Sequence, residues 1–100
     1  MPQTDGKIPL VGELPRYTGS ENVFEDETVA VYATADPVPQ VAEITLKLLE
    51  KDGWRGKVTA QDASMRHLTF RRGRLKLTAY ISVAKGLGNR TAIQYHLVQL

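Results

Sequence analysis

Apolar and polar residues alternate through most of the second half of the chain, which is the period of strands with one buried face. This pattern predicts strands over residues 57–61, 66–71, 74–83 and 90–98. The β-branched and aromatic residues from Thr28 to Thr34 predict an earlier strand. Because Gly, Asp or Asn occupies each break between the later strands, we expect hairpins there.

Between the first strand and the later ones, apolar residues recur at helical spacing and predict an amphipathic helix over residues 37–52. We expect Asp36 to cap its start and Pro37 to be its first residue. Gly53 suits the left-handed conformation that ends helices, and Trp54 is placed to fold back onto the last turn. The order of elements predicts an α+β two-layer sandwich, with one helix on a mostly antiparallel sheet of four to five strands.

A two-residue turn at Arg72 and Gly73 would pair Arg71 with Arg74 and Leu68 with Leu77. The residues that we expect to face the helix are Leu68, Phe70, Leu75, Leu77, Ala79, Ile81 and Val83, with Ile93, Tyr95 and Leu97 from the last strand. The residues that we expect to face the other side are His67, Thr69, Arg71, Arg74, Lys76, Thr78, Tyr80 and Ser82.

Residues 1–27 are rich in Pro and Gly and show no period, so we interpret them as an irregular N-terminal arm before a single domain over residues 28–100. The apolar residues that could pin the arm onto the domain are Ile8, Leu10, Val11 and Leu14. The polar opening contains no apolar run that suits a signal peptide or a membrane-spanning helix, and it resembles a domain boundary. We therefore expect the chain to be part of a longer protein.

Charge is unevenly distributed along the chain. Residues 1–52 hold four Lys and Arg against ten Asp and Glu, a net charge of −6, whereas residues 53–100 hold nine against one, a net charge of +8. Either the basic half meets an anionic partner, or the two halves neutralise each other in the fold.

The densest basic segment is the hairpin over residues 66–76. The candidate residues for binding an anionic partner are Arg66, His67, Arg71, Arg72, Arg74 and Lys76 in this segment, with Tyr80 after it. Cations beside an exposed aromatic ring on an open sheet are typical of surfaces that bind single-stranded nucleic acid, although Tyr80 stands almost alone on the predicted outer face. The simpler interpretation is a solvated hairpin, or one that pairs with the acidic residues 25–27, and we rank it first.

Residues for catalysis or metal binding do not converge in the sequence. The absence of cysteine excludes thiol nucleophiles, disulfides and cysteine-ligated zinc. His67 and His96 are the only imidazoles, and with Asp62 they lack the spacing of a zinc site. Ser64 and Ser82 lack a partner base in register. We therefore predict no enzyme, no metal site and no cofactor.

Several local features resemble small α+β domains of bacterial envelope-associated and uncharacterised proteins. They are Leu14-Pro15, Gly19-Ser20, the strand at residues 29–34, the helix end at Leu48, Leu49, Gly53 and Trp54, and the hairpin residues Leu68, Phe70, Arg71, Arg72 and Gly73. The resemblance spans about residues 14–98; members often carry a Phe-Tyr pair on the helix, where this chain has Ile44 and Thr45. It implies a non-catalytic accessory domain, of a kind that often follows a signal or lipoprotein sequence. If such a sequence was removed from this chain, the resemblance implies a location in the cell envelope or periplasm.

Two functions follow from these observations. The first is a non-enzymatic interaction or structural module of a larger bacterial protein, whose partner is another protein or another domain of the same chain. The alternative is binding of nucleic acid or another polyanion through the hairpin over residues 66–76.

Overall fold

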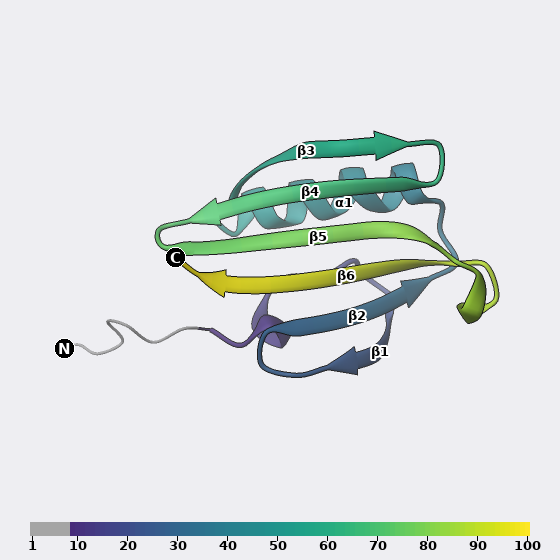
Figure 1. The fold of residues 1–100 in the computed structure, drawn as a ribbon, viewed down its shortest axis with the longest axis horizontal. Helices are drawn as coiled ribbons and strands as arrows, with labels where there is room; N and C mark the ends of the chain where they lie inside the picture. Colours follow the sequence, from purple (N-terminus) through teal and green to yellow (C-terminus); the bar gives the residue numbers. More distant parts are fainter. Residues whose placement is uncertain (1–8) are drawn as a thin grey trace.

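The computed structural model describes residues 9–100, which form one antiparallel sheet with a helix against one face (Figure 1). The strands are β1 (Glu21–Glu25), β2 (Val29–Thr34), β3 (Arg55–Asp62), β4 (Met65–Arg72), β5 (Leu75–Ala84) and β6 (Arg90–Gln99). The helix α1 spans Val38–Lys51, and η1 (Val11–Glu13) and η2 (Lys85–Leu87) are short 3-10 helices. The α+β class is confirmed.

The sheet has six strands in the order β1-β2-β6-β5-β4-β3, so the expected four to five strands is corrected to six. The additional strand is β1, which pairs with β2 and lies in the segment predicted to be an irregular arm. All five residues of β1 are exposed, so the strand has no buried alternation that would mark it in the sequence. The first eight residues of the predicted arm, including Ile8, lie outside the described residues.

The turn between β4 and β5 lies one residue later than predicted. Arg72 pairs with Leu75 and Arg71 with Lys76, so Gly73 and Arg74 are the two turn residues. Gly73 has a φ of 61°, a conformation that glycine adopts without the steric cost of a side chain. Each strand partner therefore shifts by two positions, which leaves the strand side chains on their predicted faces but moves Arg74 from the strand into the turn.

The helix begins after Pro37, which occupies the N-cap position. The prediction that Asp36 caps the helix and that Pro37 is its first residue is therefore wrong. The Asp36 carboxylate instead accepts a hydrogen bond from the Tyr17 hydroxyl. At the other end, Gly53 has a φ of 94° and the Trp54 amide donates to the Leu49 carbonyl, so the predicted C-terminal cap is confirmed.

The core lies between the sheet and two covering segments. The helix packs on β3, β4 and β5, where Leu68, Phe70, Leu77, Ala79 and Ile81 are buried as predicted. Ile93, Tyr95 and Leu97 of β6 are also buried, and Trp54 is only 2% exposed. Val83, at the far end of β5, is exposed despite its place in the predicted inward set.

The half of this face that α1 leaves open is covered by residues 9–20. Val11 and Leu14 are buried there as expected, together with Tyr17, whereas Leu10 is exposed. The Tyr95 hydroxyl donates to the Pro15 carbonyl at 2.9 Å, which ties this segment to β6. Figure 1 shows α1 and η1 on the same, more distant side of the sheet. In residues 9–100 no segment covers the opposite side, which we call the outer face.

Candidate functional site on the outer face

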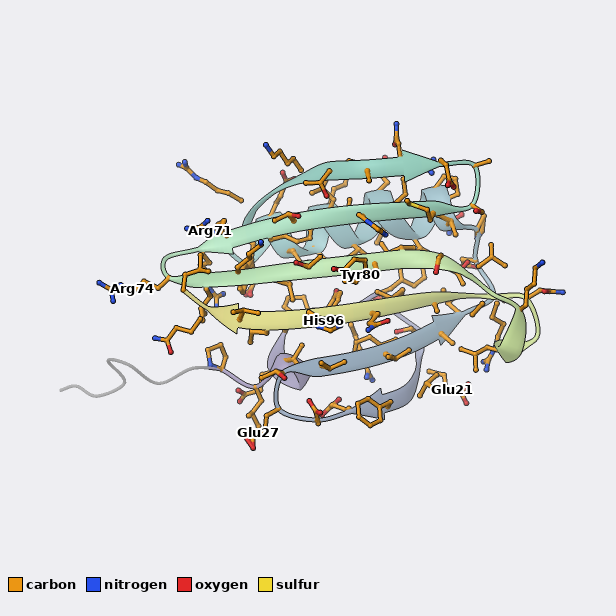
Figure 2. The ribbon with its side chains drawn as sticks, in the orientation of Figure 1. Glu21, Glu27, Arg71, Arg74, Tyr80 and His96 are labelled. Atoms are coloured by element: carbon orange, nitrogen blue, oxygen red, sulfur yellow. The ribbon has the colours of Figure 1, made fainter. Side chains whose placement is uncertain are left out.

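Three aromatic side chains lie side by side across the central strands of the outer face. The Tyr80 ring of β5 contacts His67 of β4 at a centroid distance of 4.6 Å and His96 of β6 at 5.7 Å, in each case nearly at a right angle. Figure 2 shows Tyr80 and His96 on these central strands. We call His67, Tyr80 and His96 the aromatic row. Tyr80 is thus less isolated than the sequence indicated, because β6 brings His96 from 16 positions further along the chain.

Three cations face one another at the end of the outer face near the β4–β5 turn. Arg71 of β4 pairs directly with Arg55 of β3 on one side and with Lys76 of β5 on the other. We call Arg55, Arg71 and Lys76 the cation row. Lys57 follows Arg55 by two residues and shares its face, while Arg74 projects away from the end of the hairpin (Figure 2).

None of these five cations forms an ion pair with another residue of the described chain. The ion pairs found in residues 9–100 are Lys47–Glu43, Arg72–Asp52 and Arg90–Glu21. Like charges placed directly opposite on neighbouring strands repel and destabilise a sheet. The cation row therefore concentrates positive charge that the described part of the fold leaves uncompensated.

Two of the predicted binding residues do not share this surface. The Arg72 guanidinium lies over the Trp54 ring at 4.6 Å and forms an ion pair with Asp52 at 2.9 Å, on the helix side of the sheet. Arg66 donates to the main-chain carbonyls of Asp62 and Met65 near the β3–β4 turn. Arg55 and Lys57 of β3 instead lie with the remaining cations on the outer face. The sequence analysis did not single them out because they lie outside the hairpin, in the strand before it.

The acidic residues 25–27 do not neutralise the hairpin. They lie at the β1–β2 turn, at the opposite edge of the sheet from β3, and Figure 2 shows Glu27 well separated from Arg71. The Asp26 carboxylate accepts hydrogen bonds from the Thr28 and Val29 amides, each at 2.9 Å, and these bonds lower its pKa. No ion pair within residues 9–100 joins the acidic residues to the cation row.

The two imidazoles of the outer face are separated by Tyr80, which contacts both of them. The Asp62 carboxylate is engaged in the β3–β4 turn, where hydrogen bonds from Ser64 lower its pKa. No group of three His, Asp or Glu side chains within residues 9–100 is arranged to hold a metal ion.

Tyr95 has a raised pKa because it is buried in the core, and its hydroxyl binds the arm rather than an open site. No helix of residues 9–100 has the length and apolar character needed to cross a bilayer.

Comparisons of the chain with known protein families, curated proteins and solved structures found no match. The resemblance to envelope-associated domains therefore stays a prediction. The arrangement of the outer face is the remaining basis for a functional proposal.

Proposed function

We propose that the chain is a non-enzymatic binding module that holds an anionic partner on the outer face of its sheet. The supporting observation is the cation row, in which Arg71 lies directly between Arg55 and Lys76 and no acidic residue among residues 9–100 is in ion-pair contact with them. As an accessory module of a larger bacterial protein, it would hold its partner rather than transform it.

The spacing of the cation row favours a partner with several anionic groups. Neighbouring strands lie about 4.8 Å apart, so the three Cα positions span about 10 Å across the sheet. Lys57 and Arg74 extend the positive surface along β3 and beyond the turn. A single carboxylate or phosphate engages only part of this surface, whereas a polyanion neutralises the repulsion along the whole row.

The rest of the outer face favours a hydrated partner over a second packed layer. Thr69 and Thr78 pair with each other between the cation row and the aromatic row, and Gln94 lies beside His96 with a 2.7 Å contact between their side-chain nitrogens. Covering such groups with an apolar surface costs free energy unless each finds a hydrogen bond. Polyanion interfaces retain water and tolerate these groups.

The test is a fluorescence-anisotropy titration of labelled heparin fragments, used as a generic polyanion, at about 50 and about 200 mM salt. Three phosphate-like contacts predict that the affinity falls by about 20- to 40-fold between these salt concentrations. The variant Arg55→Gln, Arg71→Gln, Lys76→Gln should lose the salt-sensitive binding.

A matched control removes three positive charges elsewhere through Lys47→Gln, Lys51→Gln and Lys85→Gln. We expect this control to bind heparin like the unmodified chain, because Lys47 and Lys51 lie on α1 and Lys85 in η2 at the other end of β5. Equal losses in both triple variants would mean that only net charge matters. Unchanged binding in the cation-row variant would overturn the proposal.

A further inference from the structure

We infer that the anionic partner is a single-stranded nucleic acid, which contacts the cation row through its phosphates and stacks a base on Tyr80. This inference rests on the function proposed above and specifies its ligand. It is carried by the second feature of the outer face, the aromatic row on the same central strands as the cation row.

The two rows share strands and lie at a fixed separation. Arg71 and His67 are four residues apart on β4, and Lys76 and Tyr80 are four residues apart on β5. At about 3.3 Å per residue this places the rows about 13 Å apart along the strands. A ligand that reaches both rows must carry negative charge at one point and a flat apolar surface at another, as a nucleotide chain does.

The surface between the rows is uncharged and able to form hydrogen bonds. Thr69 and Thr78 pair there across β4 and β5, and the Thr59 and Thr69 hydroxyls of the neighbouring strands lie 3.4 Å apart. These hydroxyls can meet sugar or phosphate oxygens without selecting a particular base. We therefore expect little sequence preference.

Tyr80 is the member of the aromatic row best placed to receive a base. Tyr80 is 37% exposed, and His67 and His96 are both less exposed than Tyr80. His67 and His96 flank its ring from the two neighbouring strands, which restricts the ring before any ligand binds. Because both imidazoles meet Tyr80 nearly at right angles, neither of them stacks face to face on the Tyr80 ring. We infer that a base takes this stacked position.

Other polyanions match only part of this surface. A sulfated glycan, a polyphosphate or an anionic lipid surface can neutralise the cation row but offers no planar base to Tyr80. Duplex DNA keeps its bases paired and stacked, so it also reaches the cation row alone. The two rows together therefore favour the single strand.

The experiment compares four probes by fluorescence anisotropy: a labelled oligothymidylate of about 12 nucleotides, the corresponding duplex, heparin fragments and vesicles of phosphatidylcholine with phosphatidylserine. Tyr80→Leu should weaken oligothymidylate binding by about 5- to 150-fold, the loss of one stacked base, and leave heparin binding unchanged. Tyr80→Phe keeps the ring and should bind oligothymidylate like the unmodified chain.

A second measurement guards against a folding defect in Tyr80→Leu. Its urea unfolding should remain cooperative, with a midpoint only slightly below that of Tyr80→Phe, because the substitution removes ring contacts on the outer face and leaves the core intact. In NMR spectra of the unmodified chain, the imidazole protons of His67 and His96 should shift on addition of oligothymidylate and stay in place on addition of heparin.

The outcomes separate the two proposals. Oligothymidylate binding that survives Tyr80→Leu, or equal affinity for the single strand, the duplex and heparin, would overturn the nucleic-acid inference while leaving the polyanion-binding function intact. Binding to anionic vesicles without binding to oligothymidylate would also overturn the inference. Failure of every anionic probe to bind would overturn both proposals.

Discussion

Arg71 and Arg72 are neighbours in the chain, yet they point to opposite faces of β4 and meet opposite surroundings. Arg72 lies over Trp54 and pairs with Asp52, so its charge is used inside the fold. Arg71 lies between Arg55 and Lys76, where its charge is opposed by charges of the same sign. Of these two adjacent arginines, one therefore stabilises the fold and the other forms no ion pair with residues 9–100, because consecutive side chains of a strand alternate between faces.

The same contrast holds for the two faces of the whole sheet. The inner face is apolar and covered by α1 and residues 9–20, whereas the outer face carries hydroxyls, imidazoles and cations without a covering segment in residues 9–100. Substitutions on the inner face should therefore change stability, and substitutions on the outer face should change binding.

The largest expected effect comes from Leu77→Ala on the inner face. Leu77 is fully buried beneath α1, so the substitution should lower the free energy of unfolding by about 2 to 5 kcal/mol. The neighbouring outer-face substitution Thr78→Ala should cost about 1 kcal/mol or less. Urea denaturation of both variants measures the difference, and a larger cost for Thr78→Ala would mean that the two faces are interchanged.

The inner face could be predicted from the sequence because alternation alone separates Leu68, Phe70 and Leu77 from their neighbours. The turn was predicted one residue too early, but the predicted faces of the strands stay correct, because turns at Arg72-Gly73 and at Gly73-Arg74 put the same strand side chains on the same faces. The helix end at Gly53 and Trp54 was predictable for a similar reason, because a local motif defines it.

The candidate site was less predictable because it depends on which strands are neighbours. Arg55 joins Arg71 only through the pairing of β3 with β4, and His96 joins Tyr80 only because β6 lies beside β5. Strand β1 escaped detection because Val23 and Phe24 are both exposed, which leaves no buried period in its five residues. In each case the missing information is an arrangement in space rather than a local preference.

A smaller effect should separate the two neighbouring arginines directly. Arg72→Gln removes a cation–π contact and a partly exposed ion pair, and should cost about 1 kcal/mol of stability. Arg71→Gln removes the same charge but relieves repulsion from Arg55 and Lys76, so it should be neutral or stabilising by about 0.2 to 1 kcal/mol.

In heparin binding we expect the opposite order of effects, with a larger loss for Arg71→Gln than for Arg72→Gln. Arg71→Gln should reduce the slope of log affinity against log salt concentration by about one unit, which corresponds to one lost contact, whereas Arg72→Gln should leave this slope nearly unchanged. Each variant is the charge-matched control of the other. Equal stability losses, or equal losses of heparin binding, would show that the two arginines occupy equivalent surroundings after all.

The smallest effect tests whether the acidic turn and the cation row are electrostatically separate. The pKa of Asp26 is lowered by hydrogen bonds from the Thr28 and Val29 amides, so its ionised form is favoured in the folded state. This contribution to stability is present above the unfolded pKa of about 3.9 and is lost as pH falls through the lower folded pKa. Asp26→Asn should therefore be slightly less stable than the unmodified chain at about pH 7, and this difference in stability should narrow as pH falls below about 3.9.

The salt dependence of the stability difference between Asp26→Asn and the unmodified chain shows which groups stabilise the Asp26 carboxylate. Hydrogen bonds from adjacent amides are short-range, so the stability difference at neutral pH should change little between low and high salt. Attraction to distant exposed cations is screened by salt, so a difference caused by such cations would shrink. Urea denaturation of both proteins at two pH values and two salt concentrations measures this. A stability difference that closes with added salt at neutral pH would mean that Asp26 is held by positive charge rather than by the two amides, either that of His96 on β6 or that of the hairpin. If the hairpin supplies that charge, the acidic turn would compete with an anionic partner for the cation row.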